Sequence, residues 1–181
     1  MTELDVSAGP LGDCTGLWRR TLLIDADGTR DTGTDVVWLQ GLSAYVDSRG
    51  FAGVLRQRGR VFQWQRDIDT GPTPPTPDVG TMHRDGDTLV EEGVHSDYVE
   101  HWVRDPGPGA PVWAATLRSP LGAALLLRVG DTFGWATPRG VTVDRVNSPR
   151  WAELAPERMN GQLRADGVRW SLLSGEGNLG L

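Results

Sequence analysis

One stretch near the middle of the chain, residues 96–104, carries side chains whose types and spacing could do chemistry. Alternate side chains of a β-strand point to the same side, so four chemically distinct groups share one face: Tyr98, Glu100, Trp102 and Arg104. This face is too polar for an ordinary core and too aromatic for an ordinary surface. We predict that it lines a ligand cavity inside a barrel. A shift of one residue in the register would turn the opposite face, with His101, inward instead.

Two further strand-like segments add candidates for the same cavity. Trp38 and Gln40 share a face, as do Tyr45 and Arg49, and Arg49 could offer two parallel N–H donors to a carbonyl or carboxylate. The alternative for Arg49 is a simple ion pair with a neighbouring aspartate at the barrel rim, and the alternative for Trp64 is core packing. The candidate substrate-binding residues are Trp38, Gln40, Tyr45, Arg49, Trp64 and Trp102. The candidate catalytic residues are Glu100 and Tyr98.

Glu91 and Glu92 are adjacent, so on a strand they face opposite sides and one of them points inward. An inward glutamate beside Glu100 would form a carboxylate pair whose repulsion raises one of the two pKa values. Such a group could act as a general acid or base near neutral pH. The alternative is a glutamate that makes a structural pair with an arginine.

The sequence does not indicate a metal or cofactor site. His95 and His101 share a face, but along a strand they lie ~20 Å apart, which is too far for one ion. Glycine-rich phosphate-binding motifs do not occur, and Cys14 is the single cysteine. We expect no cofactor and no metal.

The elements that must position these residues are short strands joined by turns. The pattern predicts strands over residues 17–24, 35–40, 44–49, 60–68, 80–84, 88–94, 96–104, 112–118, 123–129, 132–137, 162–165 and 168–173. Residues 71–77 and 105–111 are rich in Pro and Gly and are predicted as surface loops. Ser148 and Pro149 can begin one C-terminal helix, which Pro156 then interrupts. These elements favour an all-β fold, a closed antiparallel up-and-down barrel of about ten strands, over a sandwich.

Composition narrows the possible partners. The chain of 181 residues has a net charge of −6, and its 18 basic residues are all arginine and are scattered. Binding to nucleic acid is therefore not expected. No apolar run reaches the length of a membrane span, and no signal peptide is recognisable. We expect a cytoplasmic protein with a flexible lead over 1–15 and a single barrel domain over 16–181, of unknown oligomeric state.

Gly16-Leu17-Trp18, followed by basic residues, resembles the Gly-x-Trp opening of lipocalins and other calycin barrels, in which the tryptophan plugs one barrel end. Residues 35–49 also resemble a motif of uncharacterised bacterial lipocalin-like proteins. The resemblance implies a calycin-like barrel with a ligand cavity and leaves the chemistry open. The haem-binding nitrobindin type has a histidine ligand late in the chain, and this sequence has none after His101.

These observations lead to three hypotheses for function. The first is a cofactor-free cyclase, isomerase or lyase of specialised metabolism that holds an apolar substrate in a tryptophan-lined cavity. The second is a carrier or sensor of a hydrophobic small molecule that uses the same cavity without catalysis. The third is a structural or interaction domain, which would require a barrel packed solid. The inward acidic residue favours the enzyme, since a carrier of apolar ligands has little need of it.

Overall fold

The computed structural model describes residues 11–181. The larger part of the lead expected over 1–15 lies outside the described residues, and Leu11–Cys14 form a short 3₁₀ helix, η1. The first half of the chain forms strands β1 (Gly16–Ile24), β2 (Arg30–Asp31), β3 (Val37–Gln40), β4 (Ala44–Asp47), β5 (Phe51–Arg58), β6 (Val61–Asp69), β7 (Val79–Asp85), β8 (Thr88–Gly93) and β9 (Val99–Arg104).

Eight of these strands close into an antiparallel barrel. Each strand pairs with the next along the chain, and β1 bonds to β3 on one side and to β9 on the other. The short strand β2 pairs only with the end of β1. The expected closed antiparallel barrel is therefore confirmed. Closure pairs β1 with β9, so neither of these strands is left as an edge.

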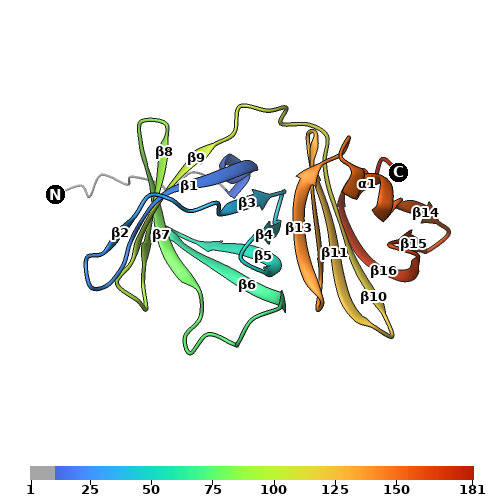
Figure 1. Ribbon diagram of the computed structural model, residues 1–181, viewed down its shortest axis with the longest axis horizontal. Helices are drawn as coiled ribbons and strands as arrows, with labels where there is room; N and C mark the ends of the chain where they lie inside the picture. Colours follow the sequence, from blue (N-terminus) through green and yellow to red (C-terminus); the bar gives the residue numbers. More distant parts are fainter. Residues whose placement is uncertain (1–10) are drawn as a thin grey trace.

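The remaining strands form a second, seven-stranded antiparallel sheet beside the barrel, to its right in Figure 1. Its elements are β10 (Val112–Ser119), β11 (Gly122–Val129), β12 (Thr132–Thr137), β13 (Gly140–Arg145), α1 (Pro149–Leu154), β14 (Glu157–Met159), β15 (Gln162–Ala165) and β16 (Val168–Gly177). The sequence pattern predicted about ten strands in one barrel, whereas the barrel closes after β9. The predicted Pro/Gly loop over 105–111 is where the chain leaves the barrel for the second sheet.

The helix forms where its capping residues predicted it. The Ser148 side chain accepts a hydrogen bond from the Trp151 backbone N–H at 3.3 Å, and Pro149 occupies the first turn. Ala155 adopts a left-handed conformation directly before Pro156 and ends the helix. In the part of the chain described here, no helix is both long enough and apolar enough to cross a membrane.

Four strands, β2, β5, β13 and β14, were not expected from the sequence. In the pairing of β5 with β6, Ala52 lies opposite Ile68 and Gly53 lies opposite Arg66, so Asp67 forms a bulge in β6. A Cβ atom at Gly53 would lie 1.9 Å from the Gln65 carbonyl oxygen, so this close approach requires glycine. The bulge shifts the alternation of β6, so that Trp64 belongs to the barrel interior and Ile68 to the cluster between the barrel and the second sheet.

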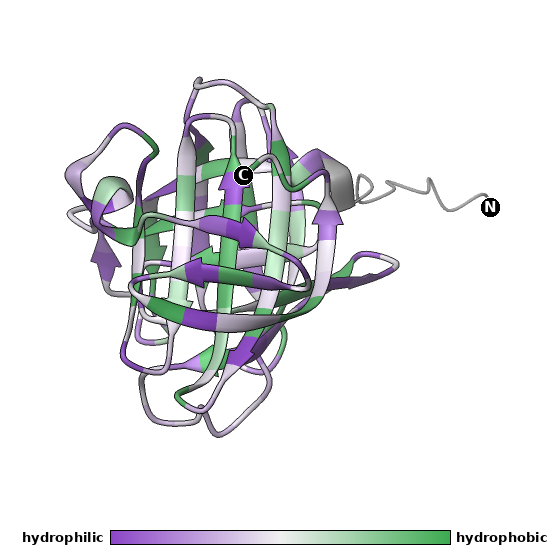
Figure 2. Ribbon diagram, turned by 90° about the vertical axis from the view of Figure 1, so that its right-hand side faces the viewer, coloured by the Kyte–Doolittle hydropathy of each residue, from purple (hydrophilic) through white to green (hydrophobic). Residues whose placement is uncertain are grey.

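The core consists of three apolar clusters. One occupies part of the barrel interior, one lies between the barrel and the second sheet and holds them together, and one lies beyond the second sheet under α1. In Figure 2, which views the molecule from the second-sheet end, hydrophobic and hydrophilic segments alternate along the strands. Strands β4 and β12 have buried residues on both of their faces, because each lies between two of these clusters.

Trp18 is fully buried beside η1, as the sequence predicted for one end of the barrel. Its indole N–H donates to the Cys14 carbonyl at 2.7 Å, and its ring stacks on Trp38 with centroids 5.8 Å apart. The guanidinium groups of Arg84 and Arg104 lie 5.0 and 4.6 Å from the Trp18 ring centroid. The two cations thus cover the Trp18 ring, and this ring packs against Trp38, which lines the cavity described below.

The barrel and the second sheet approach closely at Gly134, where an added Cβ would lie 2.8 Å from two atoms of Val46. We expect Gly134→Ala to lower the free energy of unfolding by about 1–3 kcal/mol, because the two layers would have to separate. Gly140→Ala is the matched control, since a Cβ at Gly140 meets nothing within 4 Å. Thermal unfolding compares them, and equal Tm values would show that the layers do not pack as described.

Candidate functional site

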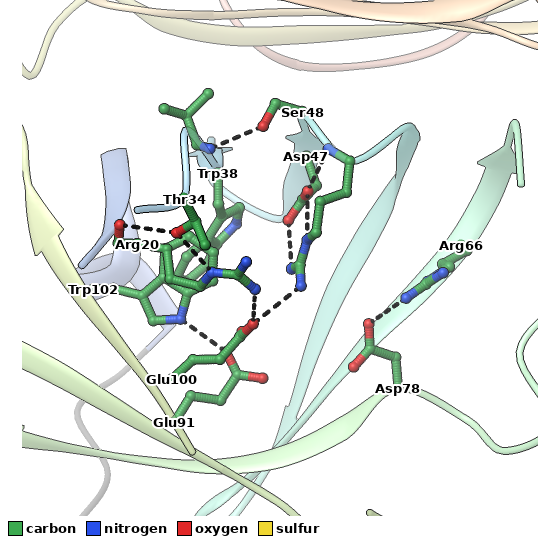
Figure 3. Close-up of polar contacts among 12 residues, drawn as sticks. Arg20, Thr34, Trp38, Asp47, Ser48, Arg66, Asp78, Glu91, Glu100 and Trp102 are labelled. Carbon is green, nitrogen blue, oxygen red and sulfur yellow. Dashed lines mark hydrogen bonds and ion pairs between the residues drawn. The ribbon is translucent and has the colours of Figure 1, made fainter. Parts of the chain in front are cut away.

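A cavity of about 250 Å³ lies inside the barrel. It combines three indole rings and a phenol with arginine and carboxylate side chains, the mixture predicted from residues 96–104. Its lining residues are Arg20, Leu23, Asp25, Trp38, Asp47, Arg49, Trp64, Arg66, Asp78, Glu91, Tyr98, Glu100 and Trp102. Figure 3 shows most of the polar groups at its centre.

The inward face of β9 is the face predicted from its alternation. Glu100 and Trp102 are buried and line the cavity, whereas His101 is half-buried and Val103 is exposed. Tyr98, just before the strand, also lines the cavity. Arg104 shares the face but lies outside the lining, because its guanidinium is over the Trp18 ring.

Glu91 is the inward member of the Glu91–Glu92 pair, and Glu92 is exposed. It lies directly opposite Glu100 in the pairing of β8 with β9. The Tyr98 hydroxyl donates to Glu91 Oε1 at 2.8 Å, and the Trp102 indole N–H donates to Oε2 at 3.1 Å. Both carboxyl oxygens are thereby held in place.

The two glutamates have opposite electrostatic surroundings. Burial, followed by the carboxylates of Glu100 and Asp78, raises the pKa of Glu91 from 4.5 to about 8. Glu91 is therefore mostly protonated at neutral pH. Burial and the nearby Glu91 also raise the pKa of Tyr98, so its phenol remains a hydrogen-bond donor.

Glu100, by contrast, is paired with two arginines. Its Oε1 accepts hydrogen bonds from Arg20 and, at 3.1 Å, from Arg49. Arg49 in turn binds Asp47 through two parallel bonds of 3.0 and 2.8 Å. The Asp47–Arg49 ion pair considered from the sequence is thus present, but Asp47 is only 2% exposed and belongs to the cavity wall. Glu100 is therefore held by charge-assisted hydrogen bonds to two arginines.

A second ion pair lies across the cavity from Glu100 (Figure 3). Arg66 binds Asp78 at 2.9 Å and Asp69 at 3.1 Å, and its guanidinium lies 3.6 Å from the Phe51 ring centroid. Sequence reasoning had not assigned Arg66 or Asp78 to the site. Arg66 lies two residues after Trp64, so the alternation of a strand places both on the inward face, and this signal could have identified Arg66. No comparable pattern marks Asp78, which follows the proline-rich loop.

Arg20 is another lining residue that the sequence analysis missed. It lies two residues after the buried Trp18 on β1 and therefore shares its face, so the alternation of the strand would have identified it. Its side chain is 8% exposed and also donates to the Thr34 hydroxyl at 3.2 Å.

Of the six residues expected to bind substrate, four line the cavity: Trp38, Arg49, Trp64 and Trp102. Gln40 and Tyr45 are fully buried but lie outside the lining. The Gln40 amide accepts the Trp38 indole N–H at 3.0 Å and donates to backbone carbonyls near Ser43. The Tyr45 hydroxyl donates to the Gln65 carbonyl at 3.2 Å. Gln40 positions Trp38, and neither the Gln40 amide nor the Tyr45 hydroxyl belongs to the cavity lining.

The site offers proton transfer and binding through carboxyl and indole groups. Within residues 11–181, no group of three or more histidine, cysteine, aspartate or glutamate side chains could hold a metal ion. Cys14 is buried beside Trp18, and burial raises the pKa of its thiol to about 11, so this thiol is a weak nucleophile.

Comparison with known proteins identifies the fold alone. No protein-family model and no curated protein matches the chain. A solved structure of an uncharacterized protein, YLR301w from the yeast Saccharomyces cerevisiae, is similar, with a TM-score of 0.61 and 12% sequence identity. The match covers 89% of this chain and 98% of the yeast chain. The similarity therefore extends over both the barrel and the second sheet.

The raised pKa of Glu91 predicts how stability depends on pH. The folded state holds the Glu91 proton more tightly than the unfolded state, so this group's contribution to stability falls as the pH rises from about 4.5 to about 8. Glu91→Gln keeps the shape of the protonated group and removes this dependence. We expect the variant to be the more stable protein at pH 9, whereas Glu92→Gln should follow the wild type. Denaturation curves between pH 4 and pH 9 measure this, and a slope unchanged in Glu91→Gln would contradict the assignment.

Removing the charge of Glu100 has a different consequence. Glu100→Gln leaves the buried Arg20 guanidinium without its carboxylate, which we expect to cost about 3–5 kcal/mol of unfolding free energy. Adding Arg20→Met should recover part of this loss. Glu157→Gln breaks the exposed pair with Arg164 and should cost less than about 1 kcal/mol. Urea denaturation compares the variants, and equal losses for the two glutamate substitutions would contradict a buried network.

Proposed function

We propose that the barrel binds a small organic molecule in its cavity and catalyses proton transfer on it without a cofactor, as a cyclase, isomerase or lyase. One observation carries the proposal. A carboxyl group that is neutral near pH 7, Glu91, lies in a cavity wall directly opposite an ion-paired carboxylate, Glu100. A neutral carboxyl group beside an ion-paired carboxylate is an arrangement typical of acid–base sites.

The proton-transferring group in this proposal is Glu91. Glu100 is less suited to that role, because its Oε1 accepts hydrogen bonds from two arginines. The negative charge of Glu100 instead helps to keep Glu91 protonated. Tyr98 holds Oε1 of Glu91 and would fix the direction in which the proton leaves.

Substrate would be held by the indole rings of Trp38, Trp64 and Trp102. Trp38 meets each of the other two nearly at right angles, with centroids 5.8 and 5.7 Å apart, so the rings form walls of different orientation. Such walls favour one substrate conformer and supply the orientation that a cyclisation or isomerisation needs. The Gly-x-Trp opening and the eight-stranded closure support a calycin-like ligand barrel, which is an argument from analogy at the level of fold.

A carrier or sensor of a small molecule is the second candidate. It is favoured by the hydrogen bonds from Tyr98 and Trp102, which satisfy both oxygens of Glu91 without any ligand. In that case Glu91 would serve only to shape the wall.

The two candidates differ in what happens to a bound molecule. Small molecules that raise the Tm would be incubated with the protein in D₂O and analysed by mass spectrometry for deuterium uptake or rearrangement. We expect Glu91→Gln to reduce turnover by ~10²–10⁴-fold while affinity changes little, because it removes the transferable proton and keeps the shape.

Glu92→Gln is the control and should behave as wild type, since Glu92 is exposed on the outer face of the same strand. Ligands that bind and remain chemically unchanged would favour the carrier instead. Turnover that survives in Glu91→Gln would show that another group transfers the proton.

A further inference from the structure

The barrel wall has a gap between β6 and β7. Backbone pairing of these strands covers only Val61–Gln63, and one further bond joins the Trp64 N–H to the Asp78 carbonyl. Beyond this point β6 continues to Asp69, while the chain before β7 runs outward as the proline-rich loop seen below the barrel in Figure 1. The side chains of Arg66 and Asp78 bridge the gap.

A second hollow, of about 380 Å³, lies outside this gap, between β6 and residues 73–78. It shares Trp64, Arg66 and Asp78 with the inner cavity, so the two spaces adjoin at the ion pair. The pyrrolidine rings of Pro74 and its neighbours form much of its surface. The inner space is therefore lined by charged groups and indoles, whereas the outer one combines three prolines and Trp64 with polar side chains of β6 and of the loop.

The small size of the inner cavity indicates that a ligand bound there would extend into the outer space. Small-molecule sites usually measure about 300–1,000 Å³. The inner cavity, about 250 Å³, lies below this range, and the two adjoining spaces together fall within it. A ligand would then place a polar head inside the barrel and an apolar body outside it.

The charges of the inner cavity favour a cationic head. Its lining contains five acidic and three basic side chains, so acidic groups remain in excess, four to three, even when Glu91 is neutral. Each of the three arginines already has a carboxylate partner. The hydrogen bonds to Glu100 go to its Oε1 and that to Asp78 goes to its Oδ2, so among residues 11–181 none donates to Oε2 of Glu100 or Oδ1 of Asp78. The net charge of −6 would also attract a cation to the protein.

We infer that the ligand is a small amphiphilic amine, whose ammonium head binds between Glu100 and Asp78 and whose apolar body passes Trp64 and covers the proline rings of residues 74–77. This inference rests on the proposed function, because it names the substrate class of the same cavity. An ammonium group can also lie against the indole faces that line the cavity.

The test uses propylamine, hexylamine and nonylamine as probes, with nonanol and nonanoate as matched compounds that carry other heads. Binding would be followed by calorimetry and by the indole N–H resonances of the eight tryptophans. We expect affinity to rise about two- to fourfold per methylene, and nonylamine to bind at least about tenfold more tightly than nonanol or nonanoate. The resonances of Trp64 and Trp102 should shift, whereas that of Trp170, in the core beyond the second sheet, should not.

Two pairs of variants separate the head from the body. Pro74→Asp adds a charge where the apolar body would lie, and Pro72→Asp adds the same charge in the same loop, outside both spaces. Only Pro74→Asp should abolish the gain with chain length. Asp78→Asn should weaken the binding of all three amines. Asp67 lies outside both spaces, so Asp67→Asn should leave the binding of the amines unchanged.

Each failure has a separate meaning. Equal binding of nonylamine, nonanol and nonanoate would overturn the amine head and leave a small-molecule site in place. Equal effects of Pro72→Asp and Pro74→Asp would overturn the path of the apolar body. If no probe shifts the Trp64 or Trp102 resonance, the inference as a whole is wrong, while deuterium exchange that depends on Glu91 would still decide the proposed function independently.

Discussion

Two carboxyl groups lie opposite each other inside the barrel, and much of the site is arranged around the cost of that juxtaposition. Directly opposed residues of an antiparallel pair have Cβ atoms ~5 Å apart, so two ionised glutamates there would repel strongly. The repulsion is relieved asymmetrically. Glu100 is ion-paired with Arg20 and Arg49, whereas Glu91 is neutral near pH 7 and accepts hydrogen bonds from neutral N–H and O–H donors. One register of β8 against β9 therefore creates both an anion and an acid in a single cavity.

The second sheet contributes to this arrangement by covering the barrel wall that carries Asp47. Strand β4 is buried on both faces, with Val46 toward the second sheet and Asp47 toward the cavity. A strand held on both sides has little freedom to move. Glu176 adds a direct link, since its carboxylate accepts the backbone N–H groups of Ser43 and Ala44 at the start of β4. The position of Arg49, and through it that of Glu100, thus depends on packing outside the barrel.

Local patterns in the sequence were sufficient to predict those features of the fold that depend on a single strand or a single turn. The alternation of 96–104 predicted which face of β9 is inward, and Ser148 and Pro149 predicted the start of α1. Closure after eight strands could not be predicted in this way, because the partner of β1 is chosen by contacts between residues some eighty positions apart. Gln40 and Tyr45 show the same limit. Their alternation correctly implied burial, but their hydrogen bonds to backbone carbonyls, which turn them away from the cavity, depend on neighbouring turns and strands.

The division of the barrel interior into an apolar and a polar part limits what the cavity can hold. Leu55, Phe62, Met82 and Leu89 belong to the buried cluster inside the barrel and lie outside the cavity lining. A barrel of eight strands has room for either packed side chains or one small ligand, and here each occupies part of the interior. Replacing a buried ion-pair network by apolar side chains is often neutral or stabilising, so the charged half of the interior is not needed to hold the barrel together. The polar half is therefore better explained by what it binds than by the stability of the fold, and the packed half limits that ligand to a head group of modest size.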